Sequence, residues 1–154
     1  MEKKRGRVNK MLLETISAFT MTIGCLAKNI YFEARDQPTI GQMAVAEVVL
    51  NRVHSPLFPD TVCEVIYEGP TYRWKQNFPI KHKCQFSWYC DGKSDTPKDK
   101  KAWNRALQIA EEVYYSYGLS INSVDGAIFY HSIEVDPDWN REYVVQIEDH
   151  IFYK

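Results

Sequence analysis

The sequence predicts an α+β domain that is mostly helical, with a small β-hairpin near its C-terminal end. Three observations support this class. Apolar residues recur at alternating steps of four and three between residues 12 and 30, the spacing of one helix face. Residues 41–53 are apolar on nearly every side, as in a buried helix. Residues 126–131 and 143–147 are rich in β-branched and aromatic residues, as strands are.

The first helical region is predicted over residues 12–35, and Pro38 and Gly41 punctuate its end. Its stripe is expected to face the core and comprises Leu12, Ile16, Phe19, Ile23, Leu26 and Ile30. The helix over residues 41–53 is expected to be the central one, with Asn51 and Arg52 capping and bracing its end.

The middle of the chain alternates short elements with irregular segments. Residues 61–67 are predicted as a short helix or strand, and residues 68–83 as an irregular stretch. Tyr72 and Trp74 lie in that stretch, where they either bind a ligand or cover the edge of the core. A compact segment then ends in an Asp91-Gly92 turn, a charged linker covers residues 93–101, and Gly118 closes an amphipathic helix that starts near Ala102.

Length and charge limit the possible partners. The 154 residues suit one domain, which we divide into a basic tail (residues 1–10) and a folded domain (residues 11–154). The net charge of −1 gives no global attraction to nucleic acid. We expect no stable membrane span, because Glu14 interrupts the apolar run of residues 11–27 and that run continues the core stripe. A retained signal anchor is the alternative.

Glu33 is the most informative single residue, because it is the next position on the apolar stripe after Ile30. Charge is costly on an apolar face, so such a carboxyl has a raised pKa, which a general acid needs near neutral pH. The alternative is a structural acid that turns to solvent or pairs with Arg35.

The four cysteines allow several pairings and two kinds of chemistry. Cys84 and Cys90 are close enough to close a short loop by a disulfide in an oxidising compartment. With His82 they resemble zinc ligands only weakly, because short Cys-x-x-Cys pairs are lacking. We expect no metal and no cofactor.

Six motifs in one order resemble the SleB-type cell wall hydrolases, a family of spore-cortex-lytic enzymes and related bacterial and phage lysins. They are residues 26–35 (LAKNIYFEAR), 41–53 (GQMAVAEVVLNRV), 58–63 (FPDTVC), 84–88 (CQFSW), 126–131 (GAIFYH) and 150–153 (HIFY). The chain departs from the family pattern at Asp36, at Glu47 and at Glu148-Asp149, where Gly, Gln and Gly are usual.

The resemblance implies a lysozyme-like fold, related to lytic transglycosylases and resuscitation factors, as the catalytic domain of residues 11–154. It also implies cleavage of peptidoglycan glycan strands between N-acetylmuramic acid and N-acetylglucosamine, with Glu33 as the catalytic acid/base. A single carboxylate suits a lytic transglycosylase that forms a 1,6-anhydro product. A muramidase-type hydrolase would need a second carboxylate, for which Glu47, Asp125 and Glu134 are candidates.

The expected glycan contacts come from two segments. Gln85 and Ser87 offer polar groups to sugar hydroxyls, and Trp88 offers an indole for stacking, whereas Phe86 is expected in the core. Tyr130 and His131 are neighbours on a predicted strand, so one faces the groove and the other packs.

Two other function classes stay open: a cysteine-dependent wall peptidase or amidase that uses Cys84 or Cys90 with His131, and a non-catalytic wall-binding module. The preferred hypothesis is a monomeric phage or prophage endolysin. It would be held in the host cytoplasm before release to the periplasm or cell wall. A secreted or cell-wall enzyme is the alternative location.

Overall fold

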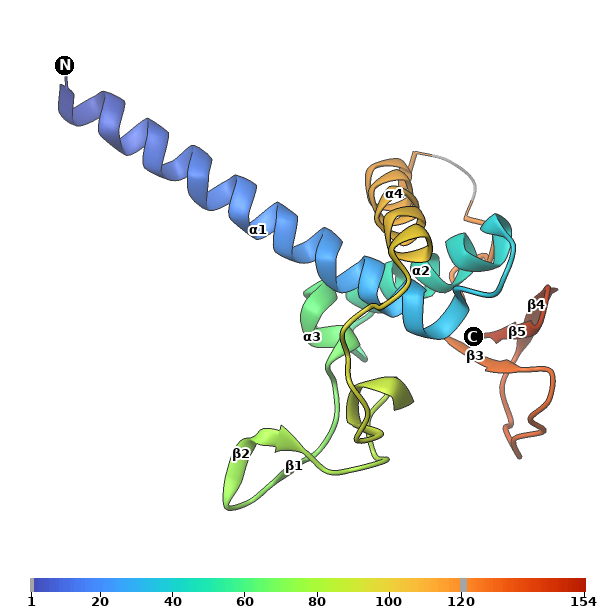
Figure 1. Ribbon diagram of the computed structural model, residues 1–154. Helices are drawn as coiled ribbons and strands as arrows, with labels where there is room; N and C mark the ends of the chain where they lie inside the picture. The colour runs from blue at the N-terminus through green and yellow to red at the C-terminus, as the bar shows by residue number, and fades with distance from the viewer. Residues whose placement is uncertain (1, 120–121) are drawn as a thin grey trace.

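The computed structural model describes the backbone of residues 2–119 and 122–154, and the side chains of these residues from Arg7 onward. Its helices are α1 (Glu2–Ala34), α2 (Thr39–Val53), α3 (Val62–Ile66) and α4 (Lys100–Ser116), with a 3-10 turn, η1 (Ser87–Cys90). Helix α2 is the central element, with α1, α3 and α4 packed around it (Figure 1). The expected central helix is therefore confirmed, and its residues from Ala44 to Arg52 are all buried.

Helix α1 divides into a part inside the domain and a part that projects away from it (Figure 1). Ile23, Leu26 and Ile30 are buried in the core, as the apolar stripe predicted. Leu12 and Ile16 are 55% and 60% exposed, so the prediction that they face the core is wrong. The reason is geometric: the helix continues straight beyond the body, and no other described element reaches its first turns. Residues 2–10, expected as a tail, continue this helix.

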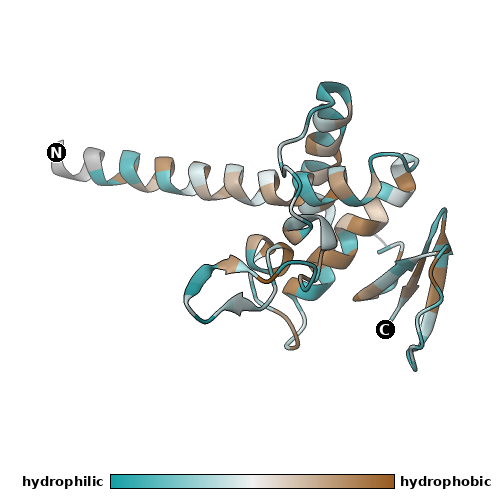
Figure 2. Ribbon diagram, turned by 60° about the horizontal axis from the view of Figure 1, so that its bottom comes forward, coloured by the Kyte–Doolittle hydropathy of each residue, from teal (hydrophilic) through white to brown (hydrophobic). Residues whose placement is uncertain are grey.

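The C-terminal sheet has three antiparallel strands, β3 (Phe129–Ser132), β4 (Tyr143–Ile147) and β5 (His150–Tyr153), in the order β3-β5-β4. The sequence predicted the two outer strands as a hairpin and missed the central one. Phe152 of β5 is fully buried and packs with Ala44 and Val48 of α2. The sheet therefore lies against the central helix as a separate layer at one end of the body (Figure 2).

A second, two-stranded hairpin lies in the segment that was expected to be irregular. It consists of β1 (Thr71–Tyr72) and β2 (Lys75–Pro79) and extends away from the helices (Figure 1). Trp74 at its tip is 82% exposed, so it does not cover the edge of the core.

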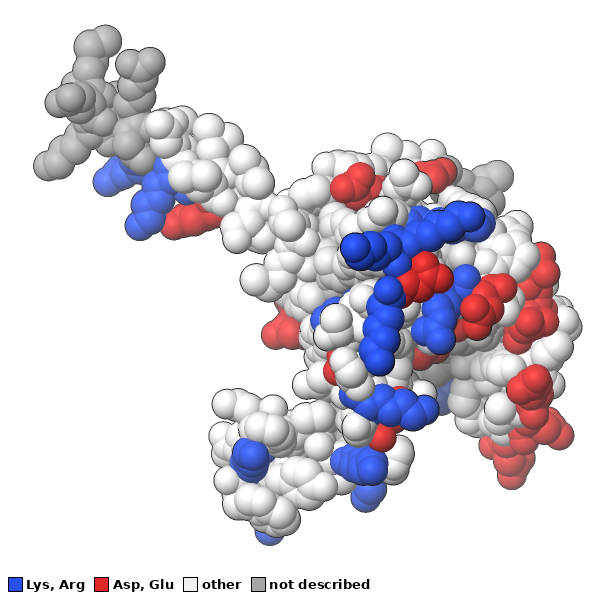
Figure 3. Space-filling model, in the orientation of Figure 1, with Lys and Arg blue, Asp and Glu red and all other residues white. Residues whose placement is uncertain are grey.

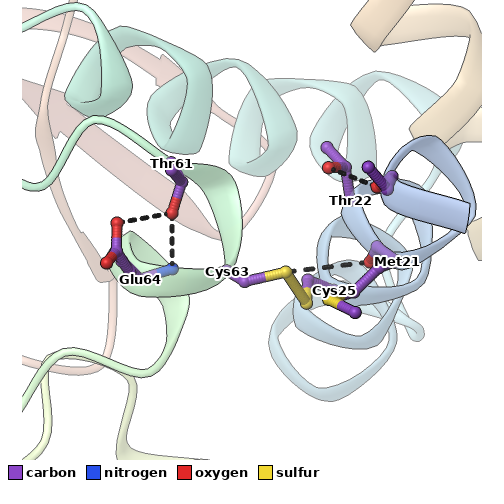
Figure 4. The surroundings of a disulfide bond; sticks show 7 residues. Met21, Thr22, Cys25, Thr61, Cys63 and Glu64 are labelled. Atoms are coloured by element: carbon purple, nitrogen blue, oxygen red, sulfur yellow. Dashed lines mark hydrogen bonds between the residues drawn. A yellow bond between two sulfur atoms is a disulfide. The ribbon is translucent and has the colours of Figure 1, made fainter. Parts of the chain in front are cut away.

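Two disulfides stabilise the body. Cys25 of α1 is bonded to Cys63 of α3 (Figure 4), whereas Cys84 is bonded to Cys90 and closes a short loop. The first joins the two helices at the level where α1 enters the core, and the Cys63 sulfur also lies 3.7 Å from the Met21 carbonyl oxygen. Pairing of Cys84 with Cys90 was the loop closure that the sequence allowed, and the structure confirms it.

Candidate active site

Glu33 lies in the last turn of α1, at the junction of the helical body and the sheet. Ile30, one turn earlier, is fully buried, whereas Glu33 is only partly exposed. Its carboxylate accepts a 2.7 Å hydrogen bond from the hydroxyl of Tyr130 on β3. The acid therefore stays at the border of the core instead of turning to solvent, and no ion pair joins it to Arg35, whose guanidinium lies over the Tyr31 ring.

Burial raises the pKa of the Glu33 carboxyl above its ordinary value of 4.5. The hydrogen bond from Tyr130 and the positive charge of Arg52 act in the opposite direction but do not cancel this effect. The pKa of Tyr130 is raised well above its usual range, because the phenol is buried and faces the Glu33 carboxylate. Tyr130 therefore stays a hydrogen-bond donor near neutral pH, and Glu33 has the environment of a proton-donating acid.

Arg52 connects this site to the interior. Its Nε donates to the Ile128 carbonyl oxygen at 2.8 Å, and its guanidinium lies over the rings of Phe58 and Phe86 at 4.8 and 5.1 Å. The neighbouring Asn51 donates to the Ala127 carbonyl oxygen at 2.9 Å. The bracing role expected for this pair is confirmed, and Phe86 is buried as expected. The sequence did not indicate that Arg52 also lies close enough to influence the charge of Glu33.

Strand alternation separates the two site candidates on β3. Tyr130 faces Glu33, whereas His131 binds elsewhere: its Nε2 lies 2.9 Å from the Tyr153 hydroxyl and its ring stacks on that tyrosine. Of this pair, only Tyr130 contacts the acid.

The three candidates at and just before the 3-10 turn are placed differently. Gln85, which precedes the turn, and Ser87, at its start, are exposed. Trp88 is 6% exposed, its ring stacks on Phe32 at 4.8 Å, and its indole nitrogen donates to Asn29 at 3.0 Å. The structure thus contradicts the expectation that this indole stacks on a sugar. Trp88 packs beneath the site because the 3-10 turn directs it inward.

None of the three candidate second carboxylates is among the groups that shift the pKa of Glu33. Glu47 is buried on α2 and accepts a 2.5 Å hydrogen bond from the Ser123 hydroxyl. Asp125 pairs with Lys154 at 2.8 Å, and Glu134 is exposed. Glu47 is therefore a hydrogen-bonded structural acid.

Glu68 is a carboxylate near the site that the sequence reading overlooked. It borders two adjoining hollows of about 740 and 450 Å³, which also share Gly69. Phe58, which covers Arg52, lines the larger hollow, and Gln85 lines the smaller one. One Glu68 oxygen is buried and has no hydrogen-bond partner among the described residues, and the Glu68 charge acts on Arg52. Only its position at the end of the short helix could have drawn attention to it.

The cysteines offer no nucleophile in this structure. All four are in disulfides, so neither Cys84 nor Cys90 presents a thiolate to His131 or to zinc. Among the described residues, no group of three or more His, Cys, Asp or Glu side chains is arranged to hold a metal ion. The cysteine-dependent peptidase is therefore disfavoured.

The chain matches the model of the Cell Wall Hydrolase family over residues 36–153, a match that begins just after Glu33. Its curated relatives include two spore cortex-lytic enzymes. That of Halalkalibacterium halodurans is 32% identical over 84% of the chain, and that of Oceanobacillus iheyensis is 33% identical over 86%. The matched regions span only 34% and 41% of these relatives' own lengths.

Two solved structures share the fold. The catalytic domain of the germination-specific lytic transglycosylase SleB from Bacillus anthracis aligns with a TM-score of 0.60 and 29% identity, over 86% of this chain and 93% of that domain. The SleB catalytic domain of Bacillus cereus aligns with a TM-score of 0.59 at the same identity, over 86% and 89% of the two chains. The expected α+β fold is confirmed, and the chain belongs to the Cell Wall Hydrolase family.

Proposed function

We propose that the chain cleaves peptidoglycan glycan strands between N-acetylmuramic acid and N-acetylglucosamine, with Glu33 as the general acid and then the general base. The observation that carries the proposal is the environment of Glu33: a desolvated carboxyl with a raised pKa, held by the Tyr130 hydroxyl at the edge of the core. Such a carboxyl is protonated at a higher pH than an exposed one, so it is prepared to donate a proton. The family membership and the SleB-like fold support the substrate class.

The reaction needs two proton transfers. Protonated Glu33 donates its proton to the glycosidic oxygen as the bond to the muramic acid C1 breaks. The 6-hydroxyl of the same muramic acid then attacks C1, and the Glu33 carboxylate accepts the hydroxyl proton. The products are a 1,6-anhydro-muramic acid end and a free N-acetylglucosamine end, and Glu33 is protonated again. No water is consumed, so no second carboxylate is required.

The surroundings of Glu33 favour this mechanism over a muramidase-type hydrolysis. Two-carboxylate hydrolysis places the acids about 5–5.5 Å apart for retention or 6.5–9.5 Å apart for inversion. The charged or polar groups that act on Glu33 are Tyr130 and Arg52, and no carboxylate is among them. Glu47 and Asp125 are engaged with Ser123 and Lys154.

The proposed place of action is the cell wall, outside the cytoplasm. Two disulfides in one small domain suit an oxidising compartment. The curated relatives carry the name spore cortex-lytic enzyme, so they favour a secreted or wall-associated enzyme and give no support to a cytoplasmic store. The endolysin origin and the monomeric state stay predictions.

Mass spectrometry of the fragments released from purified peptidoglycan tests the proposal. We expect muramic acid ends that are one water lighter than hydrolysed ends. Glu33→Gln keeps the shape of the side chain but cannot donate the proton, so we expect it to release no soluble fragments while its circular dichroism spectrum stays unchanged.

The outcomes separate the hypotheses. If the wild-type chain releases hydrolysed ends and Glu33→Gln releases none, the enzyme is a muramidase and not a transglycosylase. Cleavage in the stem peptides would favour the peptidase. Full lysis by Glu33→Gln would remove Glu33 from the mechanism, and folded wild-type protein that binds the wall without releasing fragments would favour a binding module.

A further inference from the structure

The projecting part of α1, residues 8–21, exposes apolar side chains that the body leaves uncovered. Among its large hydrophobic residues, Leu13 is 68% exposed and Met21 is 64% exposed, like Leu12 and Ile16. Val8, Leu12 and Ile16 follow one another at steps of four and therefore share one face, which Phe19 continues. Only Phe19 among them meets the body, where its ring lies against Tyr114 and Tyr115.

The opposite face of the same segment is polar as far as Ser17. Arg7, just before the segment, is followed by Lys10, Glu14 and Ser17 at steps of three and four, and Lys10 lies 3.9 Å from Glu14. Met21 ends this face with an apolar side chain. Lys3, Lys4 and Arg5 precede the segment in the sequence. Figure 3 shows the resulting pattern: basic atoms lie beside the undescribed tip of α1, and an uncharged surface leads from there to the body. This combination of a basic end and an amphipathic helix matches an anionic lipid surface.

The two threonine hydroxyls of the segment, and that of Thr22 just after it, are satisfied within the helix. The hydroxyls of Thr15, Thr20 and Thr22 donate to the carbonyl oxygens of Met11, Ile16 and Ala18 at 2.9, 2.9 and 3.0 Å. A polar group that keeps its hydrogen bond loses little when water is replaced by lipid. These threonines therefore do not oppose burial of the segment in a bilayer.

The length of the free segment decides how it meets a membrane. By length and composition alone, Arg7–Ala34 is long and apolar enough to cross a membrane, but its residues from Ile23 onward include much of the core of the domain. The 14 residues from Val8 to Met21 measure about 21 Å, well below the roughly 30 Å of a bilayer's hydrocarbon core. The part of α1 that precedes Val8 is basic in sequence (Lys3, Lys4, Arg5 and Arg7), so only the stretch from Val8 onward is apolar. That stretch is too short to cross, and it suits a helix that lies in the interface.

We propose that residues 8–21 of α1 bind the surface of an anionic lipid bilayer, with the face formed by Val8, Leu12 and Ile16 in the acyl boundary and the basic residues at the headgroups. The Cys25–Cys63 bond fixes α1 to the body just beyond this segment, so the helix and the domain move together (Figure 4). The expectation of no stable membrane span rested in part on core packing of Leu12 and Ile16, and the structure contradicts that packing.

One consequence rests on the proposed function. Glu33 lies 12 residues after Met21 on the same helix, about 18 Å along its axis. A membrane-bound α1 would hold the acid near the lipid surface, so the enzyme would cleave the glycan strands nearest to the membrane.

Vesicle flotation of the full chain tests the proposal without any activity measurement. We expect the chain to float with vesicles of phosphatidylcholine and phosphatidylglycerol, and at least about tenfold less with phosphatidylcholine alone. Leu12→Asp with Ile16→Asp should lower the partition coefficient about tenfold or more, because two large apolar groups are lost from the lipid-facing side. The matched control is Ile40→Asp with Leu57→Asp, two exposed apolar residues of the body, which should float like the wild type.

Four results would overturn the proposal. The first is absence of flotation with either vesicle, and the second is equal flotation of the Leu12/Ile16 and Ile40/Leu57 variants. The third is a dimer in light scattering that Leu12→Asp with Ile16→Asp abolishes while vesicles remain unbound, which would assign this face to a second copy of the chain. The fourth is resistance of the bound protein to alkaline carbonate extraction, which would show that the helix spans the bilayer instead of lying in its interface.

Discussion

Two buried regions of this molecule each contain one glutamate on an apolar helix, but the surroundings of the two carboxylates differ. Glu33 lies where α1 meets β3, and Glu47 lies where α2 meets the segment that begins at Asn122. Glu47 receives a hydroxyl from Ser123. Glu33 receives the hydroxyl of Tyr130 and the influence of Arg52, but burial outweighs both and raises its pKa. Glu33 is thus a candidate for catalysis because its desolvation outweighs the effect of its partners.

The largest expected difference between the two regions is in activity. Glu33→Gln should lower the rate of fragment release at least about 100-fold, the scale of a lost general acid. Glu47→Gln should leave the rate within a few-fold of the wild type, because the Ser123 contact lies away from the reaction. Initial rates on purified peptidoglycan, with equal concentrations of folded protein, measure both. A comparable loss in Glu47→Gln would show that the two acids act together.

Stability should rank the two variants in the opposite order from activity. Glu33→Gln, the less active variant, should be the more stable of the two. Glu33→Gln removes a desolvated charge, so at neutral pH it should be as stable as the wild type or more stable. A carboxyl with a raised pKa in the folded state stabilises below its unfolded value of about 4.5 and loses that contribution as pH rises. The difference between Glu33→Gln and the wild type should therefore close below this pH.

Glu47→Gln should lose about 1 kcal/mol, the difference between a charge-assisted and a neutral hydrogen bond. Urea unfolding at pH 4 and at pH 7 measures the free energies of both variants. A stabilised Glu47→Gln, or a Glu33→Gln that is destabilised at pH 7, would reverse the comparison.

Local pattern was enough to find the main helices, two strands of the sheet and the acid, but the partners of the acid come from distant parts of the chain. Helix periodicity placed the buried part of α1 and all of α2, and it marked Glu33. The pairing of Glu33 with Tyr130 spans 97 positions and depends on how β3 is seated. Alternation showed that Tyr130 and His131 face opposite sides, yet only the three-dimensional arrangement shows which side holds the acid.

The wrong or missing predictions also have physical causes that lie in the three-dimensional arrangement. The stripe on α1 continues beyond the body, and periodicity alone cannot tell a face that meets a core from one that is left free, as at Leu12 and Ile16. The central strand β5 is only four residues long, and its place in the sheet depends on pairing with β3 on one side and β4 on the other, which its own short sequence does not show. Trp88 carries an indole suited to stacking, but the 3-10 turn directs it to Phe32 and Asn29.

The smallest expected effect concerns the pH dependence of the Glu33 region. Burial is the main cause of the raised pKa of Glu33, and the hydrogen bond from Tyr130 lowers it. Tyr130→Phe removes that donor, so the pKa should rise further and the alkaline limb of kcat/KM should move to higher pH, because Glu33 then stays protonated longer. Tyr117→Phe is the matched control: this phenol donates to Asn51 at 2.8 Å and lies near Glu47. It should leave the limb in place. A limb that moves to lower pH in Tyr130→Phe, or that moves equally in both variants, would mean that the phenol does not set the acidity of Glu33.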